Sequence, residues 1–320
     1  MRDLALPPWA TPRRIALTVW GAALAASVAL VGFPIDRPRI ALWALAGVAA
    51  LNVGRGWRVV VRETLLWLPF IAALLIYDRT RGVADGLGFP VRIQEPLDAE
   101  IALFNGVLPS SWLQERLYDP AAPGPLDVAV ALVYFSHFVA IWGALLLLYE
   151  RSRPRWGALM RRTLLLSYLG LLTYIVYPAA PPWLAAKLGL TPEPVARIAT
   201  RGFEAIGLDR AAGLIEQGQA QVNRVAAIPS LHAAFALLVS VALWPLARRW
   251  WQRALLAAYP LAMGFTLVYG GEHYVIDLLL GWAYVGAVLV LVGLGERWWR
   301  ARRARGAVEG QPTPTSAPTG

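Results

Sequence analysis

The sequence of 320 residues has no cysteine, three histidines and few charged residues. The absence of cysteine excludes disulfides, thiolate nucleophiles and cysteine-ligated metals. Charged residues make up 16% of the chain and hydrophobic residues 58%, whereas soluble domains usually carry about 25% charged residues. This composition excludes a soluble globular protein and, for most of the chain, a disordered one.

Long apolar runs recur along the chain, and about 20 apolar residues in a helix can cross a bilayer. We therefore predict an all-α, polytopic membrane bundle of about eight spans. No small-residue cleavage pattern follows the first run, which is interpreted as a retained span and not as a signal peptide. The predicted spans are 15–33, 39–54, 59–77, 126–149, 162–178, 231–247, 254–269 and 274–296.

The basic residues, all but one of them arginine, are unevenly divided between alternate connections. One set of connections, which includes both termini, holds 19 of the 30 basic residues and 5 of the 20 acidic ones. The positive-inside rule places that side in the cytoplasm of a multi-pass protein of the cell membrane. Both termini are then cytoplasmic, and the long connections 78–125 and 179–230 are outside. Because the charge sorts by membrane side, it gives no support to nucleic-acid binding.

The two long outer connections mix apolar and polar residues, a pattern that favours short helices lying in the membrane interface. We divide the chain into N-terminal membrane helices (1–58), a six-helix catalytic membrane domain (59–297) and a cytoplasmic tail (298–320), basic at first. From 306 onward the tail is rich in Pro, Thr and Gly and is predicted to be disordered.

A first dense motif, Ile228-Pro229-Ser230-Leu231-His232, stands at the outer start of the span 231–247. Serine is a favoured helix cap. Free backbone N–H groups at a helix start bind phosphate. His232, in the first turn, is expected to face whatever this terminus binds.

A second motif, Gly270-Gly271-Glu272-His273-Tyr274-Val275-Ile276-Asp277, stands at the outer start of the last span. The i, i+4 spacing puts His273 and Asp277 on one face of a helix. A carboxylate there can accept from one ring nitrogen and turn the other toward a substrate, as for a histidine base or nucleophile. Asp277 also lies within an apolar stretch, where an ionisable group is a functional candidate.

Two further features allow more than one interpretation. The run from Pro178 to Trp183 contains three prolines that must end the span 162–178, and its tryptophan suits the interface. It is either a helix stop with an interfacial anchor or part of a site. His137 lies near the middle of the span 126–149, where a buried, hydrogen-bonded histidine is favoured over a supporting role in a site.

At this point the chain resembles a known family. The sequences IPSLH and GEHYVIDLLLG are similar to the second and third signature motifs of the phosphatidic acid phosphatase type 2 superfamily. With the APPW run, they look most like the branch of inositol phosphorylceramide synthase, the inositolphosphotransferase-like proteins. The resemblance covers roughly 160–290, and it implies a six-helix core with two additional helices in front.

The resemblance also implies roles for individual residues. His273 would be the nucleophile that forms a phosphohistidine, and Asp277 would orient it. His232 would protonate the leaving oxygen and then accept the proton of the incoming hydroxyl. Ser230 would help to bind phosphate. No cofactor and no metal are expected.

The sequence departs from the family pattern in its phosphate-binding cations. The phosphatase branch carries Ser-Arg shortly before the nucleophile, where this chain has Thr266 and Leu267, and its Lys- and Arg-containing first motif is replaced by APPW. Arg224 is nearest to the motif Ile228–His232 and is the favoured phosphate ligand. Residues expected as possible lining of the site are Pro181, Pro182, Trp183, Thr266 and Tyr274. The outer arginines considered are Arg79, Arg81, Arg92, Arg201, Arg210 and Arg224.

The predicted function is a membrane phosphotransferase or phosphatase acting on a lipid phosphate, with membrane lipids as partners. Transfer to a lipid hydroxyl competes with plain hydrolysis of a lipid phosphate or polyprenyl (pyro)phosphate, since water and an alcohol would use the same phosphohistidine. A transporter is the alternative from another class, but it would place polar residues on broken helices near the membrane centre.

Overall fold

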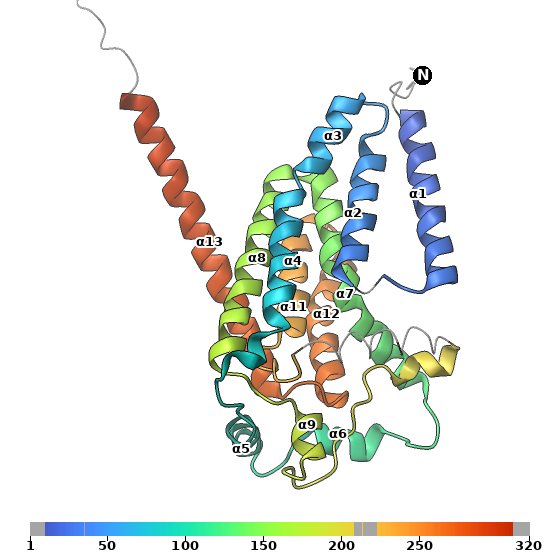
Figure 1. The fold of residues 1–320 in the computed structure, drawn as a ribbon, viewed down its shortest axis with the longest axis vertical. Coiled ribbons are helices and arrows are strands. Elements are labelled where there is room, and N and C mark those ends of the chain that lie inside the picture. The colour runs from blue at the N-terminus through green and yellow to red at the C-terminus, as the bar shows by residue number, and fades with distance from the viewer. Residues whose placement is uncertain (1–9, 35, 208–212, 214–222, 310–320) are drawn as a thin grey trace, which may run out of the picture.

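The computed structural model describes residues 10–34, 36–207, 213 and 223–309. These residues form a helical bundle in which the only β contacts are two isolated bridges (Figure 1). The predicted all-α fold class is confirmed. The α-helices are α1 (Ala10–Val31), α2 (Arg37–Asn52), α3 (Trp57–Leu65), α4 (Leu68–Arg81), α5 (Gln94–Leu103), α6 (Pro109–Leu117), α7 (Pro125–Arg151), α8 (Arg153–Val176), α9 (Pro182–Lys187), α11 (Leu231–Leu243), α12 (Trp250–Tyr269) and α13 (Val275–Glu309).

Every predicted span corresponds to helix in the structure. Five segments of the described chain are long and apolar enough to cross a membrane by themselves: Thr11–Val31, Trp57–Arg81, Pro125–Arg151, Arg153–Val176 and Val275–Arg303. The other predicted spans are α2, α11 and α12; of these, α2 has 16 residues and α11 has 13.

The span predicted at 59–77 is divided into two helices, α3 and α4, with Leu66 and Trp67 between them. Pro69 stands in the first turn of α4. A proline has no N–H to donate and its ring crowds the carbonyl four residues earlier, which here belongs to Leu65. The helix therefore ends at that residue and a new one begins.

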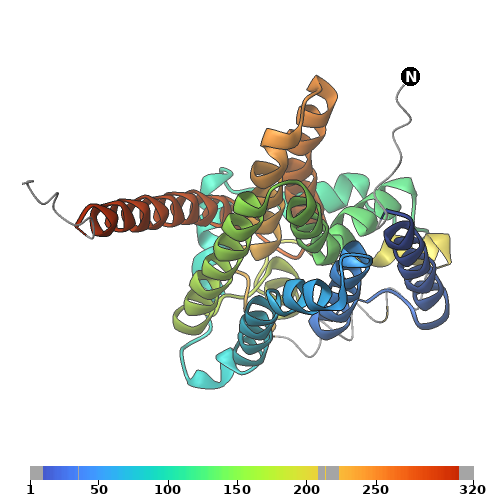
Figure 2. The ribbon, with the colours of Figure 1, turned by 90° about the horizontal axis from the view of Figure 1, so that it is seen from above.

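Two helices are longer than predicted. α8 begins at Arg153, with a proline in its first turn, instead of at 162, and α13 continues to Glu309 instead of ending at 296. Arginines had marked both segments as connections, but arginine is a good helix former and does not end a helix. Figures 1 and 2 both show the C-terminal half of α13 leaving the bundle.

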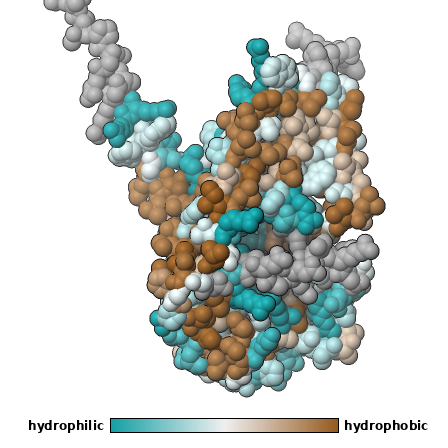
Figure 3. All heavy atoms as spheres, viewed as in Figure 1, coloured by the Kyte–Doolittle hydropathy of each residue, from teal (hydrophilic) through white to brown (hydrophobic). Residues whose placement is uncertain are grey.

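Short helices occupy both long connections, as predicted. The first contains α5 and α6, and the second contains α9 together with a 3-10 turn at Arg201–Ile206 (η2). In Figure 1, α5, α6 and α9 gather at the end of the bundle opposite to α3 and the start of α1. Hydrophobic residues extend along the upright helices, and hydrophilic residues gather between them at mid-height (Figure 3).

The starts of α11 and α13 lie against each other, which brings the two sequence motifs together. The N–H of Ser230 donates to the carbonyl of Asp277 at 3.0 Å. One turn further along α13, a Cβ on Gly281 would lie only 2.5 Å from the Ser230 carbonyl oxygen. Glycine is thus required at 281 for this close approach.

Candidate active site

His273 and Asp277 form the contact that their spacing predicted. Nδ1 of His273 lies 3.2 Å from Oδ2 of Asp277, and both side chains are buried. The same carboxylate oxygen accepts from the N–H of Tyr274 at 2.9 Å. His273 stands just before α13 and Asp277 in its first turn, so the pair closes a turn at the helix start instead of sharing a helix face. With Nδ1 engaged, Nε2 of His273 is left for chemistry.

A carboxylate from a distant part of the chain holds the start of α13. Both oxygens of Glu100, on α5, accept from backbone N–H groups, those of Val275 at 2.8 Å and Ile276 at 3.1 Å. Burial raises the pKa of Glu100, while the two N–H donors oppose that shift. Glu100 could not be singled out from the sequence, because no local pattern links its short helix to a motif far along the chain. It fixes the helix start that carries Asp277.

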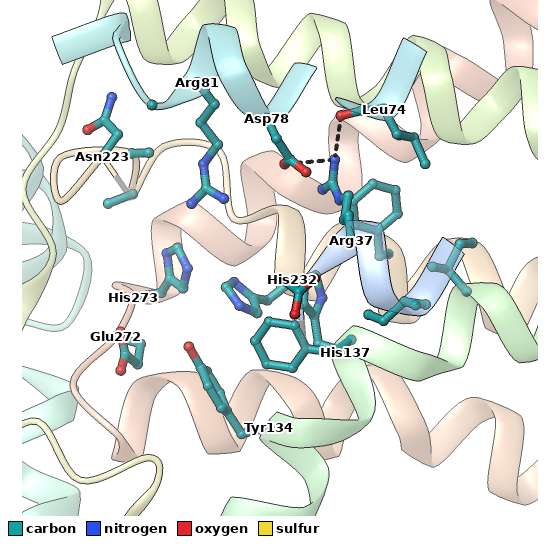
Figure 4. A pocket seen from close by; sticks show the side chains of 18 of the residues that line it. Arg37, Leu74, Asp78, Arg81, Tyr134, His137, Asn223, His232, Glu272 and His273 are labelled. Atoms are coloured by element: carbon teal, nitrogen blue, oxygen red, sulfur yellow. Dashed lines mark hydrogen bonds and ion pairs between the residues drawn. The ribbon is translucent and has the colours of Figure 1, made fainter. Parts of the chain in front are cut away.

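His232 lies between two other rings on the cavity wall. Its ring centroid is 5.6 Å from that of His273 and 4.0 Å from that of His137, and Tyr134 stacks on it at 5.3 Å (Figure 4). His137 is therefore part of the site's surroundings, and its Nδ1 has no hydrogen-bond partner among the described residues. The interpretation of His137 as a hydrogen-bonded core residue was wrong for that nitrogen.

Ser230 has a capping position. Its side-chain oxygen accepts from the N–H of Ala233 at 3.3 Å, the side chain is fully buried, and it is absent from the cavity lining. This hydroxyl thus caps the start of α11, and it helps to position His232 in the first turn of that helix.

A cavity of about 610 Å³ opens beside the histidines. It is bounded by α2, α4, α7, α8, α11 and the loops before α9, α11 and α13. Its polar lining includes Asp36, Arg37, Arg39, Asp78, Arg81, Tyr134, His137, Thr163, Arg197, Asn223, Arg224, His232, Glu272 and His273.

The arginines of this cavity come from several separate elements. Of the arginines considered from the sequence, the structure places Arg81 and Arg224 on the cavity. Arg92 instead pairs with Glu95, at 2.7 Å. Arg201 donates to the carbonyl of Pro120, at 3.2 Å. Arg79 is absent from the lining, and Arg210 lies outside the described residues.

Three cavity arginines, Arg37, Arg39 and Arg197, were not among those considered, and all three are paired with carboxylates. Arg37 pairs with Asp78 at 3.0 Å, and Arg197 holds both oxygens of Glu272, at 2.8 and 3.1 Å. Arg81 differs from these, because its Nε is buried and finds no hydrogen-bond partner among the described residues. A buried charge is normally paired. Arg81, which points between His273 and His232 in Figure 4, is therefore the cation best placed to receive an anion.

The segment from Pro178 to Trp183, which ends in APPW, joins the two motifs through its backbone. The N–H of Ala179 donates to Val225, before the first motif, at 2.6 Å, and the N–H of Trp183 donates to Gly271, in the second motif, at 3.1 Å. Pro181 and Trp183 line the cavity. The segment thus follows the end of α8 and forms a wall of the site.

Three residues expected as possible lining lie outside the cavity: Pro182, Thr266 and Tyr274. Pro182 is buried at the start of α9. Thr266 is buried within α12, where its carbonyl accepts from Gly270. The Tyr274 ring packs into a separate cluster with Leu97 of α5. These residues lie close to the motifs in sequence, which suggested that they line the cavity, but their side chains are not directed into it.

No group of three or more His, Cys, Asp and Glu side chains in the described part of the chain is arranged to hold a metal ion. The chemistry available here consists of a histidine–aspartate pair, a second histidine facing it, and a set of guanidinium groups around one cavity.

Comparison with known proteins agrees with this arrangement. Residues 106–291, more than half of the chain, match the PAP2 superfamily. The chain belongs to the PAP2 superfamily. A curated relative, the phosphoinositol dihydroceramide synthase of Bacteroides thetaiotaomicron, is 29% identical over 224 residues, which cover 67% of this chain and 71% of the relative. No solved structure matches the chain.

Membership in the PAP2 superfamily makes this protein a membrane enzyme, a lipid phosphotransferase or phosphatase. Lipids are accordingly its substrates. The matched residues contain all three histidines and Asp277, but they begin after Arg37, Arg81 and Glu100. Part of the cavity wall therefore comes from a region that the family comparison does not cover.

Proposed function

We propose that this PAP2 member transfers a phosphorylated headgroup from a phospholipid to a lipid alcohol through a phosphohistidine at His273. The observation that carries the proposal is that His232 and His273 line the same cavity, with His273 paired to the buried Asp277. A nucleophile oriented by a carboxylate and faced by an acid–base group is the arrangement that covalent catalysis requires.

In the first step, Nε2 of His273 attacks phosphorus and the bond from phosphorus to the leaving lipid oxygen breaks. His232 gives that oxygen a proton. Asp277 stabilises the positive charge that develops on the phosphorylated ring, through its contact with Nδ1 at 3.2 Å. Arg81 neutralises the charge on the phosphoryl oxygens, as oriented cations do in phosphoryl transfer.

In the second step, the acceptor hydroxyl gives its proton to His232 and its oxygen attacks phosphorus. The bond from phosphorus to nitrogen breaks, and both histidines return to their starting states. Water in place of the alcohol would give hydrolysis. The similarity to a phosphoinositol dihydroceramide synthase supports an inositol phospholipid as donor and a long-chain amide alcohol as acceptor.

We expect the purified protein, in liposomes holding an inositol phospholipid and a long-chain N-acyl amino alcohol, to form a new phosphoinositol lipid and diacylglycerol in equal amounts. Mass spectrometry of the lipids, with protein-free liposomes as control, measures both products. Diacylglycerol together with free inositol phosphate and no new lipid would contradict transfer and identify a hydrolase that cleaves the phosphodiester.

We further propose that both termini are cytoplasmic and that the cavity opens on the outer side. The uneven distribution of arginine between the connections supports this orientation. The absence of natural cysteine permits single-cysteine labelling, at Arg155→Cys between α7 and the apolar part of α8 and at Glu115→Cys on α6. Both side chains are exposed.

An impermeant thiol reagent added to intact cells should label the position-115 variant and spare the position-155 variant until the cells are broken. The opposite pattern would mean that the protein is inserted the other way around, with its cavity facing the cytoplasm.

A further inference from the structure

The cavity continues past His232, away from His273, into an inner end where apolar side chains stand beside the ion pair of Arg37 and Asp78. In Figure 4, His137 lies on the side of His232 that is remote from His273. The proposed reaction uses the region between His273 and His232 and leaves this inner end without a role. Its apolar walls come from α2, α4, α7 and α11, and consist of Ile40, Leu74, Phe138, Ile141, Trp142 and Phe235.

Besides the Nε of Arg81 and the Nδ2 of Asn223, two polar atoms on the lining have no hydrogen-bond partner among the described residues, the Nδ1 of His137 and the Oγ1 of Thr163. Thr163 is only 2% exposed, so water does not reach it freely. A helical threonine can donate to the carbonyl four residues earlier, but this hydroxyl does not do so. Leaving a buried polar group unpaired is costly. Two such groups on one cavity indicate a ligand that pairs with them.

Both groups lie deep along their helices. At 1.5 Å per residue, His137 is roughly 18 Å from the start of α7 at Pro125, and Thr163 is roughly 20 Å from the end of α8 at Val176. Both of those ends belong to the part of the bundle that carries the loops with α6 and α9. A pocket whose walls combine hydrocarbon side chains with polar groups suits an amphipathic molecule that arrives with its chains in the bilayer.

We propose that the inner end of the cavity is the acceptor subsite, and that it binds a lipid alcohol bearing a second hydrogen-bonding group such as an amide. This inference rests on the proposed function. Thr163 and His137 hydrogen-bond the polar groups of the acceptor, and the apolar wall accommodates its chains. The acceptor hydroxyl then lies beside His232, gives its proton to that ring and attacks phosphorus, whose bond to His273 breaks.

The test measures how the phosphoenzyme divides between the two acceptors, lipid alcohol and water. In Thr163→Val, which keeps the side-chain shape, the ratio of transferred to hydrolysed headgroup phosphate should fall about tenfold, the usual effect of losing one buried hydrogen bond. His137→Phe keeps a ring against His232 and should lower the same ratio. Because it is a ratio, any loss of folded protein cancels.

Ser167→Ala is the matched control. Ser167 lies one turn further along α8 and is also buried without a partner, but it is absent from the cavity lining. It should leave the ratio unchanged. A second arm replaces the amide alcohol by a simple long-chain alcohol, for which the Thr163→Val effect should shrink to less than twofold.

An unchanged ratio in Thr163→Val and His137→Phe, or an equal fall in Ser167→Ala, would overturn the acceptor subsite while leaving the proposed function intact. Failure of the wild-type protein to release diacylglycerol from any donor would instead overturn the proposed function itself, and the subsite with it.

Discussion

His273→Ala is expected to abolish both turnover and covalent labelling of the protein by phosphate. The reason is that Nε2 of His273 is the atom proposed to bond to phosphorus, and no other nucleophile lies against Asp277 in the described structure. Acid-labile phosphate on the purified protein, measured after rapid quench with a labelled donor, reports this step directly. Label that persists in His273→Ala would show that another residue is the nucleophile.

The contrast with His232→Ala separates the two roles. Loss of a general acid–base group slows turnover by about 10²–10⁴, without removing the nucleophile. A donor with a good leaving group needs no proton, so much of the first-step rate should return with it. The phosphoenzyme should then accumulate, since the second step still lacks its base. Equally low activity with every leaving group would contradict the assignment of His232.

Arg81→Gln is expected to lower kcat/KM by about 10²–10³, the size of effect seen when one preorganised donor to a developing negative charge is removed. Arg81 is singled out because its Nε is buried and unpaired in the described structure, whereas Arg37 and Arg197 already hold carboxylates. Arg81→Lys should recover part of the loss, since it restores charge but not the planar fork of donors.

Arg79→Gln provides the comparison for this prediction. Arg79 lies two residues earlier on α4, outside the cavity lining, and its replacement should leave kcat/KM within about twofold, as is usual for substitutions away from a site. Similar losses in both variants would indicate a general effect on α4 or on membrane insertion. That result would remove Arg81 from the phosphate site.

The local features of the site could be predicted from the sequence. The contact between His273 and Asp277 depends only on a spacing of four residues. The role of Ser230 as a helix cap depends only on the residues that follow it. The positions of the helices followed from apolar runs. Their ends did not, because Pro69 divided one apolar run and arginines failed to end two others.

The arginines that line the cavity and the carboxylate that holds the start of α13 could not be predicted, because both depend on contacts between elements that are distant in sequence. Arg37 comes from the start of α2, Arg81 from the end of α4 and Arg197 from the loop after α9. Glu100 reaches the start of α13 from α5. No local sequence pattern predicts which helix ends meet at one cavity. The division into domains at 58 and 297 remains a prediction.

The place of Arg37 on the cavity wall has a consequence for how the protein is made. α2 is among the first elements to leave the ribosome, and the loop with His273 is among the last. Since the finished cavity needs both, it stays incomplete until α13 has been inserted, although Arg37 already has its partner Asp78 on α4. A nascent or prematurely terminated chain therefore has no complete cavity. It does not react with phospholipids of the surrounding membrane until synthesis ends.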